Sequence, residues 1–471
     1  MTAVTVIRRS LREHDNTALV KASEEHDEVV PLYVVDDSYF EQAELGYPRM
    51  KFWHDSLKEL KQDLSEKDGR QLVVRRGDPA EEIQKVVDET DADAVYHNRD
   101  YRPYSKERDQ MVEDELEVPV KSFKDIVMFE KEEILTNSGT PYKVYSYYKK
   151  KWFKKDKRRP QKVKDYSTPD LDSVEIPSVS ELGFEKPEDM NVWDGGRENG
   201  LQRMKQFKQN IREYDQARDY AWKDSTSKLS PHLKFGTVSI REVFWEAERM
   251  KEDDSDSEGI ETWQEELAWR DYYMQILWNY PHEVEEPFME KYRGNEPDWD
   301  SKQDAPEKWN AWVEGKTGYP FVDAGMRQLK KTGWMHNRLR MVVTNFSCKD
   351  LWLEWRDVHD YFSRMFVDAE IASMVGGIQW SYSIGTDAQP YFRVFNPMSQ
   401  SERYDPDGKY IRKWVPELED VPDKHIHEPW KMSQSQQEQC GVVIGEDYPE
   451  PIVDHDEKRK ESVERFEKLD N

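Results

Sequence analysis

The first third of the chain alternates short apolar runs with amphipathic stretches. Four of these runs are rich in β-branched residues and bounded by polar residues, so they predict buried strands. They span residues 3–7, 28–36, 71–77 and 93–98. Between them, "RMKFWHDSLKELKQDLSEKDG" carries apolar side chains at helical spacing and ends on a glycine. Strands alternating with helices predict an α/β domain with a parallel, doubly wound sheet.

The middle of the chain has a different pattern. No G-x-G-x-x-G follows the first strand, so the dinucleotide-binding fingerprint is absent there. Residues 149–164, "KKKWFKKDKRRPQKVK", hold ten bases and one acid. Such a run is either a solvated linker or a contact for a polyanion, and the pattern alone leaves both open. We expect three units: an α/β domain over 1–130, a linker over 131–190 and a helical domain over 191–471.

Helical periodicity dominates from about residue 191 onward, which predicts an all-α domain. One stretch breaks this pattern, "DAEIASMVGGIQWSYSIGTDA" over residues 368–388. Its paired glycines predict a turn or a close approach of the backbone to a ligand.

Composition changes the picture in two ways. Net charge is −27, from 97 acids against 70 bases, but 17 Trp, 24 Tyr and 17 Phe indicate a folded chain rather than a disordered one. The acidic surface suits a high-salt cytoplasm, although an ordinary acidic protein is the alternative. It also argues against nucleic acid as a partner unless a local basic surface overrides it.

Several classes of protein find no support. No apolar run reaches the ~20 residues of a membrane span, and the first residues lack the apolar segment of a signal peptide. The two cysteines, Cys348 and Cys440, show neither a disulfide framework nor metal-ligand spacing. We therefore expect a cytoplasmic protein without a metal.

Three stretches of the helical region carry candidate chemistry. "TSKLSPHLKFGTVSIR" (226–241) places hydroxyls where a helix begins, which suits a phosphate or simple capping. "EELAWRDYY" and "WMHNRLRM" each place polar residues and a large apolar side chain on one helical face. These residues are Glu266, Trp269 and Arg270, and Asn337, Arg340 and Met341. A carboxylate, an amide and an indole that converge on one cavity would bind and stack a planar base.

Together these stretches resemble the cryptochrome/photolyase family over nearly the whole chain. "RRSLREHDNTAL", "ELAWRDYY", "EGKTGYPFVDAGMRQL", "GWMHNRLRM" and "GTDAQPYFRVFNP" follow the family order. "MHN" before Arg-Leu resembles the class I enzymes that repair cyclobutane pyrimidine dimers. The resemblance implies an α/β antenna domain, a helical FAD-binding domain and a monomer.

The resemblance also implies roles for single residues. Residues implied to bind FAD are Tyr214, Thr226, Ser227, Lys228, Leu229, Ser230, Trp263, Arg270, Arg340, Asp368, Glu370 and Met374. The pocket for a flipped dimer would consist of Glu266, Trp269, Asn337, Met341 and Trp380, and Arg218 would contact the DNA backbone. In the family, excited FADH⁻ donates an electron to the dimer, the ring splits and the electron returns.

Two positions depart from the family. The electron route to FAD uses three tryptophans, of which Trp355 and Trp299 match the middle and distal ones, whereas Ile378 occupies the proximal position. Met374 stands where the family often has an Asn facing the flavin N5, and Met is a weak hydrogen-bond partner. These departures leave a cryptochrome-like blue-light photoreceptor as the alternative function. The second chromophore is also open, since Glu107 lies near where some relatives bind a folate but a deazaflavin is equally possible.

Overall fold

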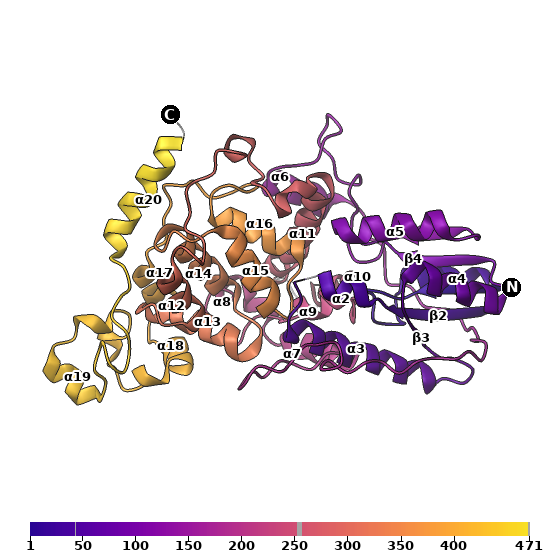
Figure 1. Cartoon of the computed structure of the whole chain (residues 1–471), viewed down its shortest axis with the longest axis horizontal. Coiled ribbons are helices and arrows are strands. Elements are labelled where there is room, and N and C mark those ends of the chain that lie inside the picture. The colour runs from indigo at the N-terminus through magenta and orange to yellow at the C-terminus, as the bar shows by residue number, and fades with distance from the viewer. Residues whose placement is uncertain (43, 252–256, 470–471) are drawn as a thin grey trace.

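The computed structural model describes all residues except 43, 252–256 and 470–471. An α/β unit and a helical unit lie side by side along the long axis (Figure 1). The α/β class of the N-terminal part and the all-α class of the remainder are both confirmed. Within the described residues, no helix is long and apolar enough to cross a membrane.

The sheet has five parallel strands in the order β3-β2-β1-β4-β5. The strands are β1 Thr2–Val6, β2 Glu28–Val35, β3 Val73–Arg76, β4 Ala94–Asn98 and β5 Val120–Phe123. Four match the predicted strands. The fifth, "VKSF", is an edge strand of half-buried residues, so it lacks the apolar run that identified the others.

Helices cover the sheet and form the connections that parallel strands require. In the α/β unit they are α1 Thr17–Glu25, α2 Asp37–Gln42, α3 Tyr47–Ser65, α4 Pro79–Thr90 and α5 Pro103–Glu115. Asp78 caps α4 by accepting hydrogen bonds from the backbone N–H groups of Ala80 and Glu81.

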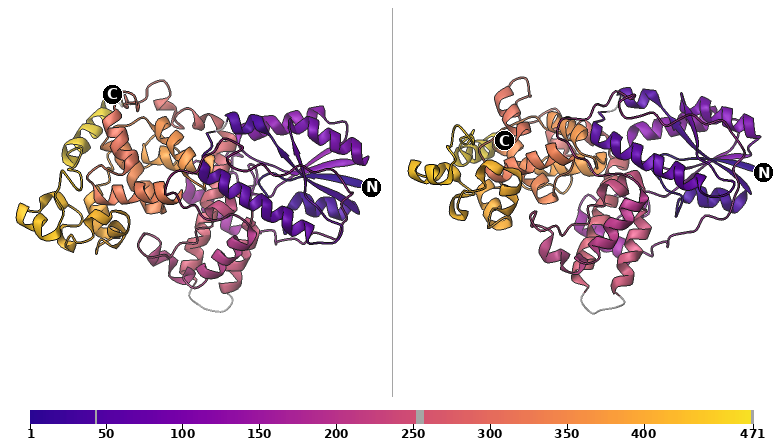
Figure 2. Two further views of the ribbon diagram at one scale, coloured as in Figure 1. Left: turned by 60° about the horizontal axis from the view of Figure 1, so that its bottom comes forward. Right: turned by 90° about the horizontal axis from the view of Figure 1, so that it is seen from below.

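The remaining helices form the helical unit, whose α7–α11 region projects to one side (Figure 2). Its helices up to residue 332 are α6 Tyr145–Lys154, α7 Arg197–Phe207, α8 Tyr214–Ala217, α9 Ser230–Phe235, α10 Ile240–Lys251, α11 Glu258–Asn279, α12 Pro306–Glu314 and α13 Pro320–Thr332. The later ones are α14 Asn337–Lys349, α15 Trp355–Met365, α16 Ile371–Ser381, α17 Pro397–Tyr404, α18 Lys409–Trp414, α19 Gln434–Cys440 and α20 His455–Leu469. Short 3₁₀ turns are η1 Ile211–Glu213, η2 Pro281–Val284, η3 Glu290–Tyr292, η4 Pro416–Leu418, η5 Asp423–His425 and η6 Pro429–Lys431.

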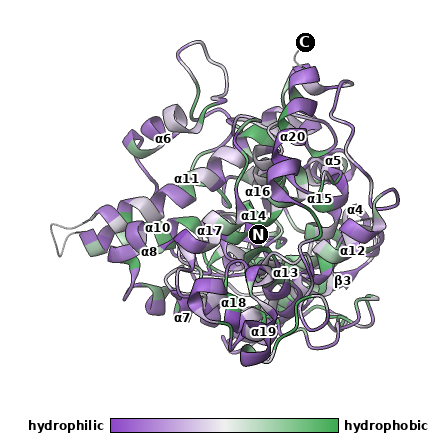
Figure 3. Cartoon of the chain, turned by 90° about the vertical axis from the view of Figure 1, so that its left-hand side faces the viewer, coloured by the Kyte–Doolittle hydropathy of each residue, from purple (hydrophilic) through white to green (hydrophobic). Residues whose placement is uncertain are grey.

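The aromatic residues account for much of the core of the helical unit. Trp152, Trp312 and Trp355 are fully buried. Figure 3 shows hydrophobic colouring toward the interior and hydrophilic colouring on the outer helices. The chain thus combines a low apolar content with a folded interior by burying large rings.

The basic run at 149–164 is only partly a linker. Its first residues belong to α6, whose buried face consists of Tyr145, Tyr148 and Trp152. The Nζ of Lys157 lies 2.7 Å from the carbonyl oxygen of Trp152, so it binds the C-terminal end of this helix. Charged and aromatic residues alternate here because one face of α6 packs inward.

The paired glycines lie inside α16, and the predicted turn between them is wrong. A β-carbon on Gly376 would lie 2.2 Å from Cε1 of Tyr273, whereas one on Gly377 would meet no atom within 4 Å. Gly376 therefore lets α16 approach α11 closely. The helix is apolar around most of its circumference, so residues 371–381 lack the alternation of apolar and polar positions that identified the other helices.

This difference predicts opposite effects on stability. Gly376→Ala should lower the free energy of unfolding by roughly 1–3 kcal/mol, because the added methyl group overlaps the Tyr273 ring. Gly377→Ala should raise it by about 0.5–1 kcal/mol, because alanine favours a helix interior. Chemical denaturation of the two variants tests this, and equal shifts would contradict the proposed contact.

Candidate functional site

A partly buried ion pair joins α14 to the segment before α16. The Nη2 atom of Arg340, on α14, lies 2.8 Å from Oδ2 of Asp368, and the Ser230 hydroxyl donates to the same oxygen at 2.5 Å. The guanidinium also stacks over Phe366 at 4.1 Å. The structure thus brings together Ser230, Arg340 and Asp368, which lie far apart in the sequence.

The second acid, Glu370, is bound by a residue of the α/β unit. Arg9 donates a close hydrogen bond to Glu370 Oε2, and Nη2 of Arg270 lies 3.9 Å from that oxygen. Burial raises the pKa of Glu370, but Arg9, Lys234 and Arg270 outweigh this effect and hold the pKa below its ordinary value. Its other oxygen, Oε1, is buried and has no hydrogen-bond partner among the described residues. Such an oxygen suits a donor on a bound cofactor.

The turn before α9 carries four more residues expected to bind FAD. Lys228 has a positive φ of 52°, and Thr226, Ser227 and Lys228 are half-buried. Leu229 is buried in the core. The Ser227 hydroxyl accepts a 3.4 Å hydrogen bond from the backbone N–H of Leu229, and Ser230 directly after the turn donates to Asp368. Hydroxyls and backbone N–H groups at a helix start are the groups that a phosphate site uses.

Two other residues expected to bind FAD lie in the packed interior. Tyr214 and Trp263 both contact Phe207, at ring distances of 5.7 and 5.4 Å. Met374 on α16 is half-buried, and its sulfur lies 3.9 Å from the Ser363 hydroxyl. Their roles toward a cofactor stay predictions.

Glu266 and Arg218 bind each other. The Nη1 of Arg218 lies 2.7 Å from Oε1 of Glu266, and both side chains are 38% exposed. The pKa of Glu266 is raised to about 7, and burial is the largest cause. The nearby carboxylates Glu265 and Asp219 also raise this pKa, whereas Arg218 lowers it. This carboxyl group therefore changes protonation near neutral pH.

Two tyrosine rings stack on Trp269, one of the residues expected to form the dimer pocket. Trp269 stacks on Tyr145 with ring centres 3.5 Å apart and an interplanar angle of 11°, and on Tyr273 at 5.4 Å. Tyr145 was not predicted, because it lies in the basic run's helix, 124 positions before Trp269 in the numbering. Its neighbours Tyr147 and Tyr148 form an aromatic run that could have suggested a stacking role.

The other pocket residues lie on α14 and α16. The amide of Asn337, at the start of α14, lies 3.9 Å from the sulfur of Met341. Trp380 near the end of α16 contacts Phe395 at 6.3 Å. Both α11 and α14 pack against α16, so the three helices that carry the pocket residues are neighbours.

Aromatic rings that were not predicted lie beside a tryptophan of the predicted electron route. Trp299 contacts Tyr382 at 5.1 Å and Trp352 at 6.0 Å. Trp355 is fully buried and donates from Nε1 to Glu296 at 3.2 Å. Tyr382 lies four residues after Ile378, one helical turn away. This spacing could have suggested an aromatic ring on the same side of the helix as Ile378.

A cavity in the α/β unit is lined by Arg9 and bordered on one side by Lys234 and Phe235 of α9. Its aromatic walls include Tyr33, Tyr39 and Trp53, and its cations include Arg8, Arg49, Arg102 and Arg108. Buried His97 also lines it, with its pKa lowered to about 3 chiefly by burial, so this ring is neutral. Glu107, the expected folate contact, is exposed and is not among the lining residues.

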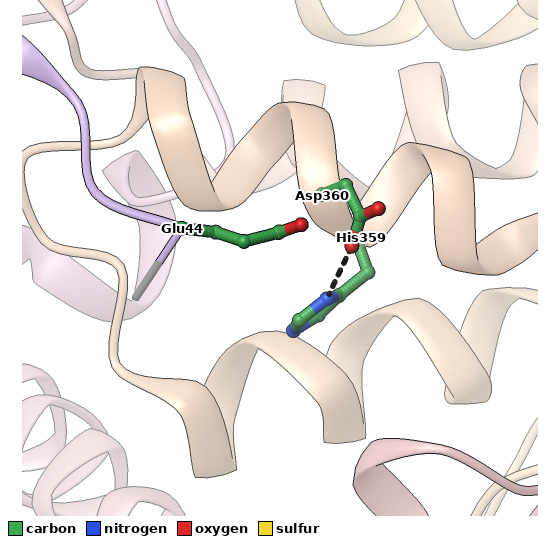
Figure 4. A group of neighbouring side chains, drawn as sticks. All are labelled: Glu44, His359 and Asp360. Carbon is green, nitrogen blue, oxygen red and sulfur yellow. Dashed lines mark hydrogen bonds and ion pairs between the residues drawn. The ribbon is translucent and has the colours of Figure 1, made fainter. Parts of the chain in front are cut away.

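One further group joins the two units. Potential metal-ligand atoms of Glu44, His359 and Asp360 lie within 4.8 Å of one another (Figure 4). Arg364 acts electrostatically on Glu44 and Lys302 on Asp360, and burial still raises the pKa of Glu44. We assign no metal to this group.

Two protein-family models match this architecture. "DNA photolyase" covers residues 3–166, and "FAD binding domain of DNA photolyase" covers residues 263–468. A photolyase-type flavoprotein is therefore the class that the fold and the matched domains define. The chain belongs to the cryptochrome/photolyase family, as its motifs indicated.

Relatives support this assignment over the full length. The chain is 40% identical to the deoxyribodipyrimidine photo-lyase of Halobacterium salinarum and 35% identical to that of Escherichia coli. The alignments cover 98% of this chain and 98% and 97% of those proteins.

Solved structures show the same fold. A class III photolyase from Agrobacterium tumefaciens has a TM-score of 0.92 and 32% identity, with 100% of this chain and 98% of that chain covered. A Synechocystis cryptochrome has a TM-score of 0.88 and 27% identity, with 98% of both chains covered. The more specific assignment to class I stays a prediction.

The position of Ile378 generates a prediction about flavin photoreduction. Ile378→Trp should increase the rate of photoreduction, because an indole can carry a hole where an aliphatic side chain cannot. The rate is followed by flavin absorbance under continuous light with an external reductant. Ile378→Leu is the control of similar volume, and equal rates in the two variants would argue against an interrupted route.

Proposed function

We propose that this protein is a deoxyribodipyrimidine photo-lyase that uses light and FAD to repair cyclobutane pyrimidine dimers in DNA. The observation that carries the proposal is the half-exposed Glu266 carboxyl beside the stacked Trp269, with a pKa near 7. A carboxyl group with this pKa can donate a hydrogen bond to a base carbonyl, and an indole can stack on the base.

Different residues would bind the flavin and the lesion. Arg340, Asp368 and Ser230 would hold the flavin side of the site, and the unpaired Oε1 of Glu370 would accept from it. When bound in its reduced form, FAD supplies the electron that light makes available.

At the lesion, Asn337 and Glu266 would bind the polar edges of the flipped bases. Trp269 and Trp380 would form the walls of the pocket and exclude water. Three neighbouring cations outweigh the effect of burial and favour an ionised Glu370, which would stabilise positive charge or donors on its cofactor side.

A blue-light photoreceptor is the second candidate, because the Synechocystis relative is a cryptochrome. Ile378 and Met374 also depart from the usual repair pattern. Photoreduction inside the protein is unnecessary for repair if the cell delivers reduced flavin, so these departures weigh less than the complete set of pocket residues.

We further propose that the cavity of the α/β unit holds a second, light-harvesting chromophore. Its arginines and aromatic rings suit a planar anion, as a folate, a deazaflavin or a flavin nucleotide would be. A photolyase from Sulfolobus tokodaii, 31% identical with a TM-score of 0.83, contains two FAD molecules.

Repair by chemically reduced protein tests the main proposal. Wild-type protein should restore dimer-containing oligonucleotides under blue light and not in the dark. Glu266→Ala should retain FAD and repair on the order of tenfold more slowly, as expected for a lost hydrogen bond to a charged or strongly polar group. Absence of repair by wild-type protein with a normal FAD content would favour the photoreceptor.

A pair of arginine variants tests the second chromophore. Arg49 lines the cavity, whereas Arg76 pairs with Asp37 at the surface. Protein titrated with a reduced folate, a deazaflavin and FAD should bind one of them at a second site. Arg49→Gln should weaken that binding and Arg76→Gln should not, with the first FAD retained in both. Loss caused instead by Glu107→Gln would place the chromophore at the surface.

A further inference from the structure

Arg218 and Glu266 have separate partners in the proposed function, yet here they bind each other. Arg218 follows α8 and is expected to contact a DNA phosphate, whereas Glu266 on α11 is expected to contact a base. Their 2.7 Å hydrogen bond joins the two, and each side chain remains 38% exposed. The residue expected to contact a phosphate and the residue expected to contact a base are therefore linked directly.

Arg218 stabilises the negative charge of Glu266, which the acidic groups around Glu266 disfavour. Glu265 and Asp219 are the carboxylates that act on it, and the phenol groups of Tyr145 and Tyr214 face it as well. Glu265 is itself bound by Lys149 of α6 at 2.7 Å. Without Arg218, Glu266 would be left as a carboxylate among acidic neighbours in a partly buried site.

We propose that Arg218 exchanges partners: it binds Glu266 in the DNA-free protein, and a backbone phosphate of the bound strand displaces Glu266 from it. This inference rests on the proposed function. The Arg218–Glu266 hydrogen bond breaks and an Arg218–phosphate contact forms. Glu266 then takes up one proton from solvent and donates it in a hydrogen bond to a carbonyl of the flipped base.

The exchange is energetically reasonable. Phosphate presents several acceptor oxygens and matches the planar guanidinium in a bidentate contact, whereas Glu266 receives a hydrogen bond from Nη1. A partly exposed ion pair is weak, so a phosphate can displace one partner readily. The carboxyl group thus becomes a donor when DNA is in place.

A double-mutant cycle on undamaged single-stranded DNA tests the shared arginine. Glu266→Gln should tighten binding by about 1.5- to 5-fold, because Arg218 no longer has a charged competitor. Glu266→Gln in an Arg218→Gln background should give no such gain. Glu261→Gln is the control for charge, since Glu261 lies on the same helix and is exposed, with Lys251 3.6 Å away. Salt must be held constant, because phosphate contacts depend on it.

Proton uptake provides a second test that does not require repair. Calorimetry at a pH slightly above 7, in buffers of different ionisation enthalpy, should show uptake of up to about one proton on binding a dimer-containing strand. Protons are taken up rather than released because Arg218 lowers the pKa of Glu266, which is about 7 while the two residues are paired. When Arg218 leaves, this pKa rises above 7 and the carboxylate binds a proton. Uptake should disappear in Glu266→Gln and persist in Glu261→Gln.

The outcomes separate the two proposals. If wild-type protein repairs dimers but takes up no proton, and Glu266→Gln binds DNA like Glu261→Gln, the partner exchange is wrong while the proposed function stands. If wild-type protein repairs no dimers with FAD bound, the proposed function itself fails.

Discussion

The architecture depends on a buried network of four charges between the two units. Arg12 Nη2 lies 2.8 Å from Asp125, and Arg241 on α10 bonds to Asp125 at 2.6 Å and to Asp15 at 2.8 Å. These side chains are at most 2% exposed. Burial raises the pKa of Asp125, but Arg12 and Arg241 lower it by more than burial raises it. The pKa therefore lies below its ordinary value and the group stays ionised. Buried charges are tolerated only when fully paired, so the network favours one docking of the α/β unit on the helices.

That docking has a chemical consequence at the flavin side. Arg9 lies three residues before Arg12, lines the cavity of the α/β unit and also bonds to Glu370. One guanidinium therefore contributes to both proposed cofactor sites. A ligand in the cavity and a ligand at Glu370 would each change the field at the other, because a low dielectric strengthens interactions between buried charges.

The sequence predicted local features well and distant pairings poorly. Four strands follow directly from β-branched runs, because that signal is local, whereas the roles of Arg340 and Asp368 were implied only by the resemblance to the family. The Arg9–Glu370 contact joins residues 361 positions apart and has no local signal. Gly376 was misread because glycine usually weakens a helix, whereas here its missing side chain makes room for Tyr273.

The acidic surface explains why the cations near the pocket are already engaged. Lys149 binds Glu265, Arg218 binds Glu266 and Lys151 binds the carbonyl oxygen of Leu135. In a chain of net charge −27, positive side chains find internal partners unless a stronger anion competes. Binding of a nucleic acid would then consist largely of partner exchange. Its affinity would depend on how many such pairs open, as well as on the number of phosphates contacted.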